Sequence, residues 1–220
     1  HAPSLAANDY QRKTMKYDLF ADEPGTPDSG VKISMPDSDV VHFPGLFSLS
    51  EADSLFAQLQ QKVTWQQEKI KLYGQVHDLP RLTAWYGDPA KTYIYSGITV
   101  RSLEWIAPLL EIKRRIEGVS DYSFNSVLLN RYRNGSDSVS WHADDEPELG
   151  QNPLIGSVSF GEARSFQMKH KSLDEKRKII LEHGSYLLMK GSTQHYWLHQ
   201  IPKSKRAMGE RINLTFRNIV

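Results

Sequence analysis

Cysteine is absent from the 220-residue chain. This absence excludes a disulfide framework, a thiolate zinc or iron–sulfur site and a cysteine nucleophile. Any bound metal must therefore rest on histidine, aspartate or glutamate ligands. The chain also lacks an apolar run near the roughly 18 residues of a membrane span, and its start lacks the apolar core of a signal peptide. We expect a monomeric intracellular protein without a membrane partner, located in a bacterial cytoplasm or a eukaryotic nucleus.

A net charge of one sign is nearly absent as well, since 27 Lys+Arg oppose 26 Asp+Glu. The distribution is uneven: residues 161–220 carry 12 Lys+Arg and 5 Asp+Glu, whereas residues 1–60 carry 4 and 9. A basic C-terminal third can form a phosphate-binding face within a nearly neutral chain. Scatter around neutrality explains the same numbers, so charge alone leaves a nucleic-acid partner open.

The length predicts one domain preceded by an arm. Residues 1–40 mix proline, glycine and acids with few periodic apolar positions, which predicts a flexible N-terminal arm. Residues 41–220 then form the domain. A capping-box pattern at residues 50–53 and apolar helical spacing up to Val63 predict a first helix. A second helix is predicted from Pro108 to Gly118, with an apolar stripe.

The rest of the chain has the patterns of strands. Short apolar or alternating runs, punctuated by glycine, predict strands at residues 123–132, 154–160, 164–169, 178–181, 186–190 and 211–220. Two helices followed by many short strands indicate an α+β fold in which the helices support a sandwich or jelly roll.

His142 and Asp144 form the first candidate site. On an extended segment, residues two apart project to the same side, so the imidazole and the carboxylate can converge on one ion. A third ligand can come from His195 or His199. Two histidines and one carboxylate form the facial triad that suits non-haem iron(II). The motif is short and common by chance, and a surface turn is the usual explanation of an isolated H-x-D.

The segment RINLTFR (residues 211–217) is the second candidate. Its alternation places Arg211, Asn213, Thr215 and Arg217 on one face and three apolar residues on the other. If the apolar face packs into a core layer, the arginines must point into a polar interior or into solvent. There they can bracket a small dicarboxylate. An amphipathic strand with a solvated basic face is the simpler alternative.

Together with its order along the chain, this combination resembles AlkB-type Fe(II)/2-oxoglutarate-dependent dioxygenases, a family that removes alkyl lesions from nucleic-acid bases. The resemblance covers residues 80–217 and rests on PRLTAWYGD (80–88), NRY (130–132), WHADDEP (141–147) and RINLTFR. It implies a double-stranded β-helix (jelly-roll) core buttressed by N-terminal helices. It also implies a nucleotide-recognition lid within about residues 65–100.

The resemblance implies a role for each matching residue. His142, Asp144 and His199 match the iron ligands, which makes His195 structural. Arg211 matches the residue that grips the far carboxylate of 2-oxoglutarate, helped by Asn130 and Tyr132. Asn213 and Arg217 match residues near the carboxylate beside the keto group. The implied cofactors are Fe(II), 2-oxoglutarate as co-substrate, and O2.

On the substrate side the resemblance implies contacts to a flipped base. Tyr93 and Tyr95 match aromatic lid positions, and the carboxylates of Asp145 and Glu146 suit a cationic 1-methyladenine or 3-methylcytosine. Tyr73 lies in a segment similar to a finger hairpin that wedges into duplexes. Phosphate-backbone contacts are expected from Arg81, Lys203, Lys205 and Arg206.

The implied function is oxidative demethylation of alkylated bases in DNA, with RNA left open, releasing formaldehyde and succinate. Two alternatives stay open. One is the same iron chemistry on a protein or small-molecule substrate, and the other is a non-catalytic nucleic-acid-binding module. A complete set of matching iron and co-substrate residues weighs against the second alternative. The joint presence of the aromatic, acidic and basic substrate-side residues weighs against the first.

Overall fold

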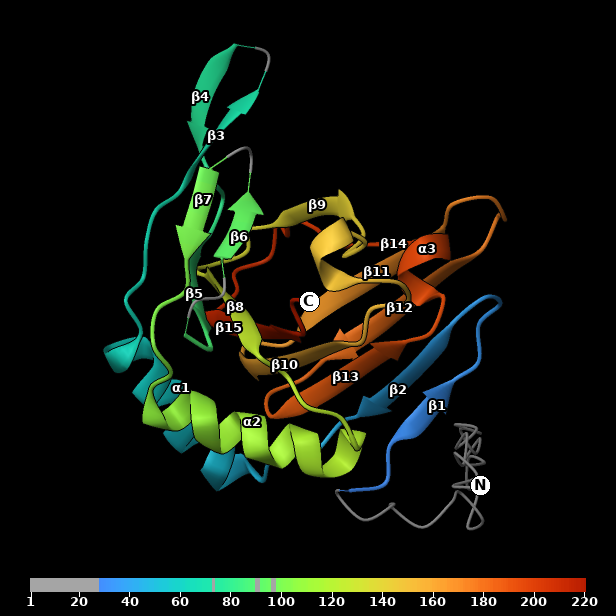
Figure 1. Ribbon diagram of the computed structural model, residues 1–220, viewed down its shortest axis with the longest axis horizontal. Coiled ribbons are helices and arrows are strands. Elements are labelled where there is room, and N and C mark those ends of the chain that lie inside the picture. Colours follow the sequence, from blue (N-terminus) through green and yellow to red (C-terminus); the bar gives the residue numbers. More distant parts are fainter. Residues whose placement is uncertain (1–27, 73, 90–91, 96–97) are drawn as a thin grey trace, which may run out of the picture.

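Two antiparallel sheets and two long helices dominate the computed structural model, which describes residues 28–220 except 73, 90–91 and 96–97 (Figure 1). The seven-stranded sheet has the spatial order β1 (Val31–Ile33), β2 (Asp39–Phe43), β13 (Ser185–Lys190), β10 (Ile155–Gly161), β15 (Arg211–Arg217), β8 (Ser126–Tyr132) and β5 (Leu82–Gly87). The four-stranded sheet has the order β12 (Lys176–Leu181), β11 (Arg164–His170), β14 (Trp197–Ile201) and β9 (Val139–His142).

Helices α1 (Leu49–Lys62) and α2 (Ala107–Ser120) cover the outer face of the seven-stranded sheet (Figure 1). The apolar stripe predicted for α2 is confirmed, because Leu109, Ile112 and Ile116 are fully buried against the sheet. A second apolar cluster, which includes Phe166 and Trp197, fills the space between the two sheets. The core therefore has two layers, one under the helices and one between the sheets.

The start of α1 corrects one detail of the sequence prediction. The capping residue is Ser48 rather than Ser50: the Ser48 Oγ accepts from the Glu51 N–H at 3.4 Å, and the Glu51 carboxylate accepts from the Ser48 N–H at 2.8 Å. Each serine is followed three residues later by an acid, Ser48 by Glu51 and Ser50 by Asp53, but only Ser48 has the glutamate that a capping box prefers. The helix itself is confirmed.

The predicted boundary at residue 40 also differs from the structure. Strands β1 and β2 begin before it and belong to the seven-stranded sheet. Met35 and Val40 are buried between the sheets, and the Trp197 indole donates to the carbonyl of Pro36 at 2.8 Å. Residues 31–40 are therefore part of the domain, and residues 1–27 lie outside the described part of the chain.

Several short elements lie outside the two large sheets. Two hairpins, β3 (Lys69–Leu72) with β4 (Gln75–Asp78) and β6 (Thr92–Tyr95) with β7 (Ile98–Arg101), lie at one end of the molecule, and β3–β4 projects from the body (Figure 1). A 3-10 turn, η1 (Pro147–Leu149), follows β9, and the short helix α3 (Thr193–Tyr196) leads into β14. Among the described residues, no helix has the length and apolar character needed to span a membrane.

Strand β15 shows how the fold creates a polar interior. Its apolar residues Ile212, Leu214 and Phe216 are fully buried under the helices, as the alternation predicts. Their burial stabilises the fold by about 1.5–3 kcal/mol each. Arg211 and Asn213 must then face the opposite sheet, where both are also buried. Polar side chains inside a sandwich require partners, so this face is where a site is expected.

Candidate metal and co-substrate site

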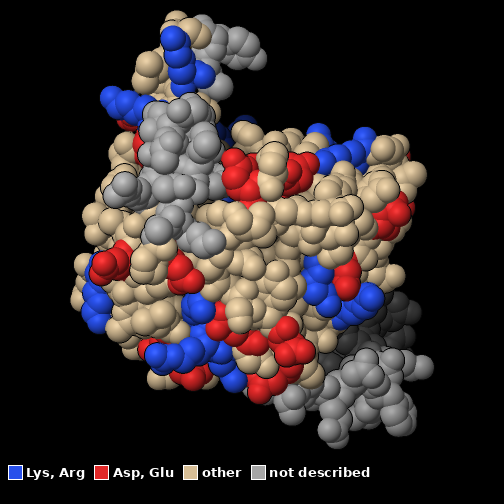
Figure 2. All heavy atoms as spheres, in the orientation of Figure 1, with Lys and Arg blue, Asp and Glu red and all other residues tan. Residues whose placement is uncertain are grey.

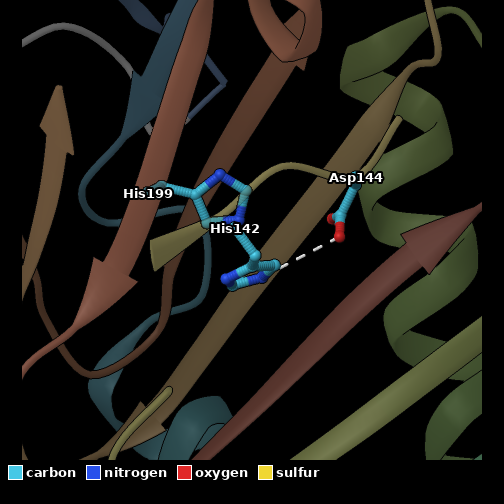
Figure 3. Close-up of side chains that lie close together, drawn as sticks. All are labelled: His142, Asp144 and His199. Carbon is cyan, nitrogen blue, oxygen red and sulfur yellow. Dashed lines mark ion pairs between the residues drawn. The ribbon is translucent and has the colours of Figure 1, made fainter. Parts of the chain in front are cut away.

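Three potential metal ligands converge between the sheets. His142 ends β9, Asp144 lies two residues further on, and His199 lies in β14 directly opposite His142 in the strand register. One ligand atom of each lies within 4.8 Å of the other two, and Figure 3 shows the two imidazoles and the carboxylate turned toward one another. Within the described ranges, this is the only such group of three. The third ligand expected from the sequence is therefore His199.

The alternative third ligand, His195, lies elsewhere. It sits on α3 with an exposed side chain, and its Nε2 accepts from the backbone N–H of Asn152 at 3.4 Å. This contact fits the structural role expected for it.

Hydrogen bonds and burial prepare both histidines to donate lone pairs. The Nδ1 of His142 lies 2.8 Å from the carbonyl oxygen of Ser140, so Nδ1 carries the proton and Nε2 presents its lone pair. His199 is buried, and this burial, with the neighbouring His142, lowers the pKa of its imidazole to about 3. A neutral imidazole is the form that binds metal ions.

Asp144 supplies the negative charge of the group. Burial alone would raise the pKa of its carboxyl group, but Arg217 and the two histidines outweigh burial and lower that pKa below its usual value. Arg217 donates from Nη2 to Oδ1 at 2.7 Å. Two imidazoles and an ionised carboxylate are a donor set that fits iron(II) and leaves coordination positions open.

The lowered pKa of His199 makes a prediction for the metal-free protein. The His199 imidazole binds a proton near pH 6.5 in the unfolded state and only near pH 3 in the folded state. Its contribution to the free energy of unfolding is therefore fully present above pH 6.5 and falls as the pH decreases from 6.5 to 3. Denaturation of wild type should show a loss of up to about 1.4 kcal/mol per pH unit from this group between pH 6 and 4. His199→Leu should show a flatter profile.

The control for this prediction is His42→Leu. Burial also lowers the pKa of His42. His42→Leu should therefore flatten the dependence of the free energy of unfolding on pH less than His199→Leu does. Identical profiles for wild type and His199→Leu would contradict the neutral state assigned to His199.

Arg211 lies at the inner face of β15 with 1% of its surface exposed. Its Nη2 donates to the Ser159 hydroxyl at 3.0 Å, while Nε and Nη1 are buried without a hydrogen-bond partner. Burial lowers the pKa of the guanidinium to about 10, so it stays charged at neutral pH. A buried cation with two idle donors fits a carboxylate ligand such as that of 2-oxoglutarate.

The other expected co-substrate residues lie on β8 and β15 and differ in the contacts that they make. The guanidinium of Arg211 lies 5.1 Å from the ring centre of Tyr132, which is 2% exposed. Asn130 is buried and accepts from the Nε of Arg81 at 2.7 Å. Asn213 uses Nδ2 to donate to the Ser157 hydroxyl and to the carbonyl of Val158, each at 2.9 Å. Asn213 thus braces β10 with its donors.

Two further arginines contact the expected co-substrate residues, and the sequence did not predict these contacts. Arg81, expected at the nucleic-acid backbone, turns inward and also donates to the carbonyl of Ser138 at 3.2 Å. Arg164 is 2% exposed and lies over the Tyr132 ring. It donates to the carbonyl oxygens of Asn134, Asp137 and Pro202. No motif marks Arg164, since its position follows only from the packing of three loops.

The expected base-contact residues are partly described. Asp145 is exposed and forms an ion pair with Lys171 at 3.1 Å, whereas Glu146 is half-buried. Tyr73 and the side chains of Tyr93 and Tyr95 lie outside the described part of the chain. The structure therefore brings together the metal and co-substrate residues and leaves the aromatic lid positions undescribed.

The expected backbone-binding residues Lys203, Lys205 and Arg206 are exposed on the loop after β14, which we call the basic loop (residues 203–206). The Ser204 N–H donates to the carbonyl of Gly135 at 2.7 Å. A Cβ at Gly135 would lie 2.8 Å from the carbonyl oxygen of Ser204, so only glycine permits this close approach. On the face in Figure 2, basic and acidic side chains are interspersed on a mostly uncharged surface.

Comparison with known proteins agrees with this geometry. The sequence model of the 2OG-Fe(II) oxygenase superfamily matches residues 39–217. The chain belongs to this superfamily. Solved structures share the fold: OsALKBH1 has a TM-score of 0.60 at 19% identity, covering 85% of this chain and 100% of its own. A prolyl hydroxylase from Trichoplax adhaerens has a TM-score of 0.57 at 10% identity, covering 82% and 83%. The expected α+β fold with a jelly-roll core is confirmed.

Curated relatives place the chain in the AlkB-type branch. Human alkB homolog 3, an alpha-ketoglutarate-dependent dioxygenase, is 43% identical in an alignment of 192 residues that covers 83% of this chain and 66% of the relative. The DNA oxidative demethylase ALKBH2 of Mus musculus is 40% identical in an alignment of 186 residues that covers 80% of this chain and 78% of the relative. The chain spans about two thirds of the length of the alkB homolog 3 proteins that it matches. The cofactors of the superfamily are iron(II) and 2-oxoglutarate.

Proposed function

We propose that this protein removes methyl groups from alkylated bases in DNA by an iron(II)- and 2-oxoglutarate-dependent oxidation. The observation that carries the proposal is the His142–Asp144–His199 group between the sheets, together with Arg211 on the inner face of β15, whose charged guanidinium has two donor nitrogens without a partner. The ALKBH2 relatives, which are called DNA oxidative demethylases, support the choice of substrate. RNA as a further substrate, the monomeric state and the expected cellular location stay predictions.

In this proposal each described residue has a task. His142, Asp144 and His199 hold the iron, which supplies oxidation by O2 when bound. Arg211 binds the far carboxylate of 2-oxoglutarate, and Tyr132 and Asn130 shape its surroundings. Arg217 lies near the other carboxylate and orients Asp144, and Asn213 keeps β10 and β15 in register beside it. Burial of Asp144, His199 and Arg211 between the sheets limits their contact with water, which strengthens their charged contacts.

The substrate side is assigned from the sequence resemblance. Tyr93 and Tyr95 would stack on the flipped base, and Tyr73 would fill the gap that it leaves in a duplex. Glu146 and Asp145 would face the cationic ring, with the charge of Asp145 shared with Lys171. Because Arg81 donates to Asn130, we assign it to the support of the co-substrate residues rather than to the nucleic-acid backbone.

One experiment tests the proposed function directly. The protein is loaded with iron(II) and 2-oxoglutarate without oxygen and then exposed to air with 1-methyladenine or 3-methylcytosine oligonucleotides in DNA and RNA form. Formaldehyde release that depends on both iron and 2-oxoglutarate is the expected result. Succinate formation that no oligonucleotide stimulates would instead favour a protein or small-molecule substrate. The absence of iron and 2-oxoglutarate binding would favour a non-catalytic module.

The basic loop gives a separate prediction for nucleic-acid binding. Replacing Lys203, Lys205 and Arg206 with glutamine should weaken binding of a methylated oligonucleotide and reduce the slope of log K against log salt by about 2–3 units, because each lost phosphate contact removes close to one unit. Binding is measured by fluorescence anisotropy at several salt concentrations.

The matched control replaces Lys32 on β1 and Lys62 on α1 with glutamine, since both are exposed lysines outside the basic loop. This control should leave the salt slope unchanged. An equal slope for wild type and the basic-loop variant would remove the loop from the proposed interface.

A further inference from the structure

Gln194 is almost completely buried on α3, with 1% of its surface exposed. Its Oε1 accepts a hydrogen bond from the backbone N–H of Asp144 at 3.0 Å. Residues 143–146 have an irregular conformation after β9. Within the described part of the chain, residues 143–145 form no hydrogen bond with another backbone group. The backbone of Asp144 is thus fixed by a side chain that comes from 50 residues further along the sequence.

The amide of Gln194 is itself held on a rigid base. The neighbouring Thr193 hydroxyl accepts from the backbone N–H of Asp39 in β2 at 3.0 Å and donates to the carbonyl of Lys190 in β13. The Gln194 Nε2 lies 3.5 Å from the sulfur of Met189, which orients the amide oxygen toward Asp144. The Nζ of Lys171 donates to the backbone carbonyl oxygen of Gln194 at 3.1 Å. Short helix α3 is therefore tied to β2 and β13 of the seven-stranded sheet, and it also leads directly into β14 of the four-stranded sheet.

These contacts divide the three metal-ligand candidates between the sheets. His142 and His199 lie on neighbouring strands of the four-stranded sheet. Two contacts connect Asp144 to the seven-stranded sheet. Its backbone N–H donates to Gln194 of α3, and its carboxylate accepts from Arg217 of β15. The distance between the carboxylate and the imidazoles therefore depends on Gln194 as well as on the packing of the two sheets.

We propose that Gln194 is a positioning residue for the metal site: it holds the backbone of Asp144 so that the carboxylate reaches the two histidines. Without the acceptor, the buried N–H of Asp144 must turn toward another partner, and the carboxylate moves with it. Loss of such outer-shell contacts lowers metal affinity by about 10–100-fold. The inference rests on the proposed metal site but not on the identity of the substrate.

The test measures metal binding by the apoprotein, without turnover. Mn(II) binding to wild type, Gln194→Met and Gln194→Asn is titrated by electron paramagnetic resonance. Methionine keeps the length of the side chain but removes the acceptor, and asparagine keeps the amide but is shorter by one carbon–carbon bond, roughly 1.5 Å. Both variants should bind Mn(II) about 10–100-fold more weakly. The visible spectrum of the Co(II)-loaded variants should also change, because it reports ligand geometry.

The matched control is Gln167→Met, which removes a half-buried amide on β11 whose oxygen accepts from Gln200 at 2.8 Å. This control should keep the wild-type Mn(II) affinity. Wild-type affinity in folded Gln194→Met and Gln194→Asn would overturn the positioning role; if Gln194→Met does not fold, Gln194→Asn decides. Absence of one-site Mn(II) binding by wild type would instead contradict the proposed metal site itself.

Discussion

Replacement of Asp144 by asparagine should lower formaldehyde release from a 1-methyladenine oligonucleotide more than about 100-fold. Outer-shell partners of a metal already contribute 10–100-fold, and Asp144 is proposed as a direct ligand. It is also the only carboxylate of the group, so its loss removes the negative charge that opposes a divalent ion. Asparagine is chosen because it keeps the volume and allows the N–H bond to Gln194 to persist.

The control for this prediction is Asp174→Asn, since the Asp174 side chain is 99% exposed and lies in the turn between β11 and β12. It should release formaldehyde at the wild-type rate. Circular dichroism and Mn(II) titration on both variants separate ligand loss from unfolding. A folded Asp144→Asn protein with undiminished release and metal binding would refute the assignment of the triad.

The second large effect is expected from Arg211→Met. Two charge-assisted hydrogen bonds to a carboxylate, at about 1.5–3 kcal/mol each, correspond to a rise of roughly 100-fold or more in the dissociation constant of 2-oxoglutarate. The metal-free, ligand-free protein should not lose stability, because methionine replaces a buried cation that has two unsatisfied nitrogens. Calorimetric titration with 2-oxoglutarate and thermal unfolding with and without it measure both quantities.

Arg131→Met is the matched control for Arg211→Met. Arg131 also lies on the seven-stranded sheet, but it pairs with Glu210 at 2.7 Å on the side of the helices, where its guanidinium lies over Trp65. Its replacement should reduce stability and leave the affinity for 2-oxoglutarate unchanged. If Arg211→Met binds 2-oxoglutarate as wild type does, the carboxylate contact is wrong.

The sequence predicts the parts of the site that lie on regular strands. The alternation of β15 separates its polar and apolar residues correctly, and His142 lies at the end of β9 as an extended segment predicts, although Asp144 already lies beyond that strand. The match to the AlkB pattern then selects His199 over His195, and the structure brings His199 to the group. Period-two patterns carry this information because each strand is buried on one apolar face.

Contacts between segments far apart in the sequence could not be predicted in this way. The inward turn of Arg81 depends on β5 pairing with β8, and the hydrogen bond of Gln194 depends on where α3 docks. Strand β1 and the first residues of β2 fall in the predicted arm because proline and acidic residues surround them, while the pairing of β2 with β13 is a tertiary effect. Local propensity is a weak guide where tertiary packing decides.

The 2.7 Å contact between Arg217 and Asp144 means that one carboxylate serves two cationic partners. An anion bound beside Arg217 competes for that guanidinium and leaves more of the carboxylate charge to a metal ion. By linkage, the metal ion must strengthen binding of the anion by the same factor. Iron and 2-oxoglutarate are thus expected to bind this protein as a cooperative pair, with an affinity for each that has meaning only when the concentration of the other is stated.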